Sequence, residues 1–128
     1  ILLPAFSVGL LSAAVLNVNN IRDVYSDKAA NKITLVVLLG RQKAFIYHLL
    51  IIVTAMLCSA IYIYQLPDSQ FWQYLFLLVA SPLIKSCIEL AQAINKDEQD
   101  GAIFNEQLKN TAISTFVFSV LFAIALIT

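Results

Sequence analysis

Four apolar runs, separated by polar stretches, set the pattern of this sequence. The second and fourth runs carry no formal charge, and the third holds only Lys85 and Glu89 near its end. Each run approaches the roughly 20 residues that an α-helix needs to cross about 30 Å of hydrocarbon. The pattern therefore predicts four membrane-spanning helices, at about residues 1–17, 44–65, 71–94 and 110–128.

The polar stretches between these runs differ in length and content. The longest, at residues 17–43, includes an apolar stretch at 35–39 followed by Gly40, which indicates a short helix ended by glycine. Residues 66–70 contain Pro67 and Asp68 and predict a tight turn. We expect a third polar linker from 95 to 109.

Composition supports a membrane class. Hydrophobic residues make up 60% of the chain and charged residues 12%, whereas soluble domains carry roughly 25% charged residues. The formal net charge is zero, so nothing indicates nucleic acid as a partner. Cys58 and Cys87 lie inside apolar segments, and we interpret them as buried thiols rather than a disulfide or a zinc site. The predicted fold class is an all-α polytopic transmembrane helix bundle, with residues 1–128 in one domain.

The first apolar run has neither a basic n-region nor a small-residue cleavage site, so it does not have the pattern of a signal peptide. The chain begins with Ile1 inside this run. We therefore expect the run to be the end of a spanning helix that has residues upstream.

Basic residues predict the orientation of the bundle. Five of the eight Lys and Arg residues lie between the first and second runs, namely Arg22, Lys28, Lys32, Arg41 and Lys43. Lys96 and Lys109 lie between the third and fourth runs, and the turn at 66–70 has none. We expect the protein to lie in the cell (inner) membrane. Under the positive-inside rule, both polar linkers then face the cytoplasm and the C-terminus faces outside.

Polar residues in the first linker follow a helical spacing. On a helix, five of them fall within about a third of a turn of one another; they are Asn17, Asn20, Asp23, Asp27 and Asn31. On the same helix Arg22 is expected to point away from this stripe, with Lys28 and Lys32 beside it. The spacing thus places two carboxylates and three amides on one face, at the cytoplasmic end of the first span.

Such a stripe suits a magnesium–diphosphate site. Magnesium prefers oxygen ligands and is usually held by one or two carboxylates together with substrate phosphates. We therefore assign Asp23 and Asp27 as candidate catalytic and metal-binding residues. The candidate diphosphate-binding residues are Asn20, Arg22, Lys28 and Lys32, whose cations would neutralise the remaining phosphate charge. A solvated linker with mixed charges would show a similar composition, and two aspartates four apart are a weak signal alone.

A family resemblance adds to this interpretation. The run N-N-I-R-D-V-Y-S-D, followed by N-K-I-T-L, resembles the second aspartate-rich motif of the UbiA prenyltransferase superfamily, in the form found in dihydroxynaphthoate prenyltransferases. That form has N-x-R-D-x-x-x-D, then Lys and Thr-Leu, then a short run ending in L-G. The matching residues are Asn20, Arg22, Asp23, Asp27, Lys32, Thr34, Leu35, Leu39 and Gly40.

One further segment matches the family, and one position departs from it. Residues 105–108 followed by Thr111 and Ala112 resemble the start of the family's last helix. Asn31 stands where the family usually has glycine, and asparagine is one of the few residues that tolerate the left-handed conformation.

The resemblance implies a nine-helix bundle with a central cavity, of which this chain is the C-terminal part from the sixth helix onward. It also implies Mg²⁺-dependent transfer of a polyprenyl chain from polyprenyl diphosphate to an aromatic acceptor in the lipid bilayer. For this form of the motif the acceptor is 1,4-dihydroxy-2-naphthoate, in menaquinone biosynthesis. The first aspartate-rich motif is absent, so the chain alone is expected to be inactive.

Two alternatives stay open. One is a prenyltransferase of the same superfamily with another acceptor, such as 4-hydroxybenzoate, haem or a chlorophyll precursor. The other is a non-catalytic membrane transporter subunit whose carboxylates bind a coupling ion. That class predicts carboxylates near the middle of the bilayer, whereas Asp23 and Asp27 lie among basic residues at its edge.

Overall fold

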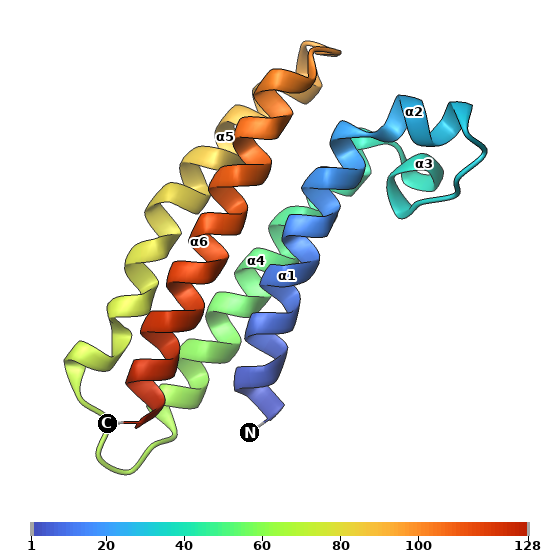
Figure 1. Cartoon of the computed structure of the whole chain (residues 1–128). Coiled ribbons are helices and arrows are strands. Elements are labelled where there is room, and N and C mark those ends of the chain that lie inside the picture. The colour runs from blue at the N-terminus through green and yellow to red at the C-terminus, as the bar shows by residue number, and fades with distance from the viewer. Residues whose placement is uncertain (1, 128) are drawn as a thin grey trace.

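The computed structural model describes residues 2–127, and within that range it consists of helices and their connections, without a strand (Figure 1). The elements are α1 (Leu2–Arg22), α2 (Val24–Ala29), α3 (Leu35–Leu39), α4 (Arg41–Tyr64), the 3₁₀ helix η1 (Phe71–Val79), α5 (Ala80–Asn95) and α6 (Gly101–Ile127). Residues 1 and 128, which begin the first predicted span and end the last, lie outside the described range.

Four stretches are long and apolar enough to cross a membrane: α1, α4, η1 with α5, and α6. Both ends of the described chain lie at one end of the bundle, whereas α2 and α3 project from the other (Figure 1). Many large apolar side chains are exposed along these helices, which suits contact with lipid rather than water. The predicted polytopic helix bundle is confirmed.

Helix α1 holds the bundle together, because it packs extensively against both α4 and α6. The core falls into two clusters. One fills the middle of the bundle and its turn end around Phe76, Phe118 and Phe122, whose ring centres lie 5.0–5.4 Å apart in edge-to-face or tilted arrangements. The other lies beneath α2 and α3 and includes Ile21, Val36 and Phe104. The second cluster is the floor on which the polar motif rests.

The first span is longer than the predicted boundary near residue 17, because α1 continues to Arg22. Val18 and Ile21 are fully buried in the second cluster, and Asn17 donates a hydrogen bond of 2.9 Å to the carbonyl oxygen of Ala44. These contacts hold the first polar residues of the motif in the helix. The first part of the predicted 17–43 loop is therefore helical.

The last span also begins earlier than predicted. Helix α6 starts at Gly101, so most of the linker predicted at 95–109 is helical. Asp100 accepts a hydrogen bond of 3.0 Å from the amide of Ala102 and satisfies one free donor of the first turn. Phe104 and Gln107 are buried and extend the inward-facing stripe of α6 beyond its apolar run. The polar composition of the linker hid this continuation.

The third span changes helix type along its length. The pattern predicts one continuous helix, but the stretch from Phe71 to Val79 is 3₁₀ and only Ala80–Asn95 is α-helical. Pro82, in the first turn of α5, has no amide proton to donate to the carbonyl group four residues earlier. The α-helical ladder therefore does not extend back across this point.

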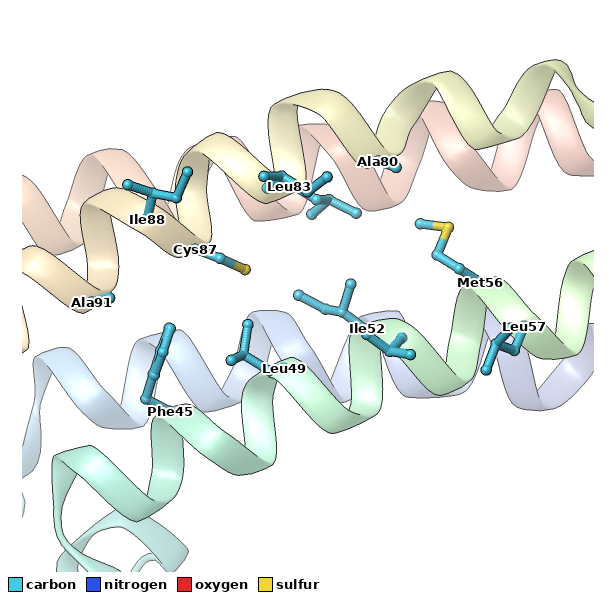
Figure 2. A pocket seen from close by; sticks show the side chains of 12 residues that line it. Phe45, Leu49, Ile52, Met56, Leu57, Ala80, Leu83, Cys87, Ile88 and Ala91 are labelled. Carbon is cyan, nitrogen blue, oxygen red and sulfur yellow. The ribbon is translucent and has the colours of Figure 1, made fainter.

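A groove runs between α4 and α5, which touch over only a short part of their length. The side chains of Leu49, Ile52, Leu83 and Cys87 point into it (Figure 2). Its volume is about 510 Å³ and its lining is almost wholly apolar. None of the predicted site residues lines this groove.

Candidate functional site

The polar motif bends where α1 meets α2. Asp23 occupies a turn position with φ −89° and ψ 6°, although its amide still donates to the carbonyl of Asn19 at 3.0 Å. The carbonyl oxygen of Asp23 in turn accepts from the amide of Asp27 at 2.8 Å. The motif is thus a helix interrupted at its first aspartate, rather than the single helix on which the stripe was predicted.

Arg22 and Asp23 form a paired network. The Nε atom of Arg22 lies 2.7 Å from Oδ1 of Asp23, and Nη2 lies 2.9 Å from Oδ2. Asn19 completes the group, because its amide donates to Oδ2 of Asp23 at 3.3 Å and its oxygen accepts from Arg22 at 2.9 Å. The prediction that Arg22 points away from the aspartates is wrong: the bend at Asp23 lets neighbouring side chains meet.

This pairing sets the charge of the first aspartate. The hydrogen bond from the Arg22 guanidinium, with a smaller contribution from its charge, holds the pKa of Asp23 below its usual value against the opposing effect of burial. Asp23 is therefore a carboxylate at neutral pH, with both oxygens already bonded.

Asp27 sits in a different environment. Only 9% of its side chain is exposed, compared with 28% for Asp23. One oxygen, Oδ1, accepts a hydrogen bond of 3.1 Å from Nζ of Lys32, while Oδ2 is buried without a hydrogen-bond partner among the described residues. Unpaired buried oxygens are uncommon and call for an explanation. Of the four carboxylate oxygens of Asp23 and Asp27, Oδ2 of Asp27 is the one that the described residues leave unpaired.

The end of α2 brings Lys32 back to Asp27. Asn31 takes the left-handed conformation with φ 53°. The amide of Lys32 then donates to the carbonyl of Asp27 at 2.8 Å, and the amide of Asn31 to that of Lys28 at 3.2 Å. This pair of backbone hydrogen bonds is a Schellman motif. Asparagine tolerates this left-handed conformation, which returns the chain so that Lys32 reaches the carboxylate of Asp27.

The three asparagines of the predicted stripe make different contacts. Asn17 is buried and bonded to the backbone of α4, so it joins helices. Asn31 ends α2. Asn20 is half-buried beside the bend, and its side chain makes no hydrogen bond within the described residues. Of these amides, Asn20 alone remains available to a ligand near the aspartates.

Lys28 lies on another face of α2. It lines a cavity of about 590 Å³ together with Tyr25, Arg41 and Lys43, and neither aspartate lines that cavity. The structure therefore brings Arg22 and Lys32 to the aspartates but does not bring Lys28 to them.

A second groove leads to the paired network from the membrane side. It runs between α1 and α6, has a volume of about 530 Å³, and is lined by apolar residues such as Val15, Leu16 and Leu108. Asn19 and Asn105 line it as well, and Asn105 accepts a hydrogen bond of 2.8 Å from Arg22. A shallow, mainly apolar groove and the charged cluster therefore meet at Asn19 and Asn105.

The donor set determines what metal chemistry is feasible. No group of three or more His, Cys, Asp or Glu side chains within residues 2–127 is placed to hold a metal by itself. Magnesium needs fewer protein ligands when phosphate oxygens supply the rest. The unpaired Oδ2 of Asp27 would suit such a shared ion, whereas both oxygens of Asp23 are bonded to Arg22 and Asn19. The described residues do not form a closed metal centre.

Two site residues were missed from the sequence. Asn19 lies four residues before Asp23, the spacing at which helical side chains meet, so this contact was within reach of the pattern. Asn105 was noted only for its resemblance to the family's last helix. Its contact with Arg22 spans 83 positions, and no local pattern could have indicated it.

Comparisons with known proteins show the family of this chain. The family model described as "UbiA prenyltransferase family" matches residues 1–108. A 1,4-dihydroxy-2-naphthoate octaprenyltransferase of Escherichia coli is 34% identical over 98% of this chain and 39% of its own length. One of Haemophilus influenzae is 43% identical over 69% of this chain and 28% of its own length.

No solved structure matches the chain significantly. The chain spans about two fifths or less of the length of these two curated relatives. The family model nevertheless covers most of the chain and includes the whole of the aspartate motif. This chain therefore belongs to the UbiA prenyltransferase family.

Proposed function

We propose that the whole protein transfers a polyprenyl chain from its diphosphate to 1,4-dihydroxy-2-naphthoate, in menaquinone biosynthesis. The observation that carries the proposal is the Asp27 carboxylate, which is buried beside Lys32 with one oxygen free. The names of the two relatives support the acceptor. The chain spans only part of each relative, so the activity proposed is that of the complete protein.

The charged residues explain why a diphosphate would leave here. Breaking the bond between the allylic carbon and the diphosphate oxygen leaves growing negative charge on that oxygen, which fixed cations stabilise. Lys32 and Arg22 lie beside the aspartates and supply two of these cations. Asn20 would add an uncharged donor to a phosphate oxygen.

Magnesium is part of the proposal. Asp23 and Asp27 would hold the ion against the diphosphate, and the ion when bound would neutralise phosphate charge as the prenyl group departs. Asp27 offers a free oxygen. Asp23 is bonded to Arg22, so a diphosphate that draws the guanidinium toward itself would release the second carboxylate.

The groove between α1 and α6 is the better candidate for the prenyl chain. It ends at Asn19 and Asn105, beside the network that contains Asp23. The groove between α4 and α5 is more apolar but is not lined by any residue of that network. A substrate in the first groove would have its tail in an apolar channel and its diphosphate at the charged cluster.

The position of the aspartates speaks against an ion-coupled transporter subunit. Both follow the end of α1, outside the four helices long enough to span a membrane. A coupling-ion site would place carboxylates within the spans. We further propose that the motif end of the bundle faces the cytoplasm at the cell (inner) membrane.

The test uses membranes containing the full-length protein. Asp23→Asn or Asp27→Asn keeps the size of the side chain but removes the charge that attracts the metal. Each variant should lose at least about a hundredfold in rate, which corresponds to about 2.7 kcal/mol at about 1.4 kcal/mol per decade. The measurement is prenylated naphthoate formed across a range of magnesium concentrations, with 4-hydroxybenzoate as a second acceptor.

Asp68→Asn is the matched control, because Asp68 is exposed in the turn at the opposite end of the bundle. It should leave the rate within about twofold. Near-normal rates for both motif variants without added magnesium would disprove the metal–diphosphate role. Preference for 4-hydroxybenzoate would disprove the proposed acceptor while leaving the transfer reaction in place.

A further inference from the structure

The short helix α2 needs outside support. It has only six residues, and isolated helices shorter than about 12 residues are marginal in water. Its first neighbour, Asp23, is already at a bend. Tertiary contacts must therefore fix how α2 is oriented and where its carboxylate lies.

Arg41, the first residue of α4, makes hydrogen bonds to two segments outside α2. Its Nε atom donates to the carbonyl oxygen of Ile21 at 3.1 Å, and Nη1 donates to the carbonyl oxygen of Glu98 at 2.7 Å. Ile21 lies in the last turn of α1, where carbonyl groups accept no hydrogen bond from an amide of the same helix. Glu98 belongs to the connection between α5 and α6. A single guanidinium thus bonds two distant segments.

The same guanidinium lies over two aromatic rings. Its carbon lies 4.7 Å from the ring centre of Tyr25 and 4.6 Å from that of Phe104, within the range of cation–π attraction. Tyr25 is on α2 and Phe104 on α6. The hydroxyl of Tyr25 also donates to Oδ1 of Asp97 at 2.9 Å. Through Tyr25, the contacts of Arg41 hold the start of α2.

We infer that Arg41 is a positioning residue, which fixes the Asp23–Asp27 segment by joining α1, α2, α6 and the α5–α6 connection. The inference rests on the proposed function for its effect on the reaction. Two of its nitrogen atoms donate to backbone carbonyl groups and its guanidinium carbon lies over two aromatic rings, so its role differs from that of Arg22 and Lys32, which lie against the carboxylates. Removing it would leave the aspartates in the chain but let their separation vary.

Lysine cannot replace this arginine fully. The planar guanidinium reaches two carbonyl groups and stacks on two rings at once, whereas an ammonium is a compact point charge. The effect of a substitution at position 41 should therefore depend on the shape of the side chain rather than on its charge alone. Lys43 provides a matched control, because it lies two positions away, is exposed, and makes no side-chain bond within the described residues.

The experiment measures hydrogen exchange and kinetics on the full-length protein. In Arg41→Gln, amides of residues 23–31 should exchange about tenfold faster, while amides in the middle of α4 keep their rates. The kcat should fall about tenfold or more and the magnesium requirement should rise, with little change in KM for the acceptor. Arg41→Lys should fall between wild type and Arg41→Gln. Lys43→Gln should match wild type in both measurements.

Outcomes separate this inference from the proposed function. Suppose that exchange is faster in Arg41→Gln while Asp23→Asn and Asp27→Asn remain active. This outcome would confirm that Arg41 positions the segment and would disprove the proposed chemistry. Wild-type exchange and kcat in Arg41→Gln would overturn the inference even if both aspartate variants are inactive. If Arg41→Gln does not fold, Tyr25→Leu decides, because it removes one ring from the cluster; unchanged exchange at residues 23–31 would then overturn the inference.

Discussion

At the residue scale, two aspartates from one motif have different surroundings. Asp23 has both oxygens bonded and 28% of its side chain exposed, whereas Asp27 is 9% exposed and keeps one oxygen free. The difference follows from the bend, which places Arg22 against Asp23, and from the left-handed Asn31, which returns Lys32 to Asp27. Identical side chains thereby acquire different environments.

The Arg22–Asp23 pair predicts a pH dependence of stability. Because the pKa of Asp23 is lowered in the folded protein, its contribution is fully present above the usual aspartate pKa of about 3.9 and is lost as the pH falls through the lowered value. The difference in melting temperature between wild type and Asp23→Asn in detergent should stay constant from about pH 7 to 5. It should shrink only below about pH 4.

Asp68→Asn serves as the control for that measurement, since the Asp68 side chain makes no bond within the described residues. It should melt close to wild type across the whole range. A difference for Asp23→Asn that already disappears between about pH 7 and 5 would contradict the pairing.

At the element scale, the ends of helices place the site more than their middles do. Helix α2 ends in a Schellman motif at Asn31, and α5 ends in the same motif with Asp97 at φ 50°. That conformation accompanies the contact of Asp97 with Tyr25. Two left-handed residues thus fix two of the contacts around the aspartate motif.

Position 31 offers a direct test of this arrangement. Asn31→Gly removes the strain of a side chain at positive φ, but it also makes the unfolded chain more flexible. Because these effects oppose each other, the free energy of unfolding should change by less than about 1 kcal/mol. Asn31→Val places a β-branched residue at positive φ and should destabilise by about 1–2 kcal/mol or more. The measurement is thermal or denaturant unfolding in detergent, with Lys28→Val on the exposed face of α2 as the control for β-branching. Equal stability of the two position-31 variants would contradict the left-handed assignment.

At the scale of the whole molecule, both polar connections lie at the same end of the bundle (Figure 1). The hydrogen bonds from Arg22 to Asn105 and from Tyr25 to Asp97 join these connections across the bundle. Seven of the eight basic residues lie in or beside them, and the turn at the opposite end has none. The positive-inside rule then predicts that this end faces the cytoplasm.

Labelling of single cysteines checks the orientation. With Cys58 and Cys87 replaced by alanine, an impermeant thiol reagent added outside cells should modify a cysteine at position 68 and spare one at position 100. Both positions are exposed, so accessibility within the fold does not bias the comparison. Modification of position 100 alone would reverse the orientation. Labelling after permeabilisation should modify both.

The sequence by itself determined the number of spans and the short helix ended by Gly40, and it placed at position 31 a residue that tolerates the left-handed conformation. These features depend on local physics: apolar length sets a span, and backbone geometry selects glycine or asparagine at a positive φ. The bend at Asp23, the early start of α6 and the partners of Arg22 and Arg41 depended on the tertiary structure. Their causes are contacts such as Asn105 with Arg22 and Glu98 with Arg41, between residues far apart in the chain. Only packing brings such residues together, and no local pattern records it.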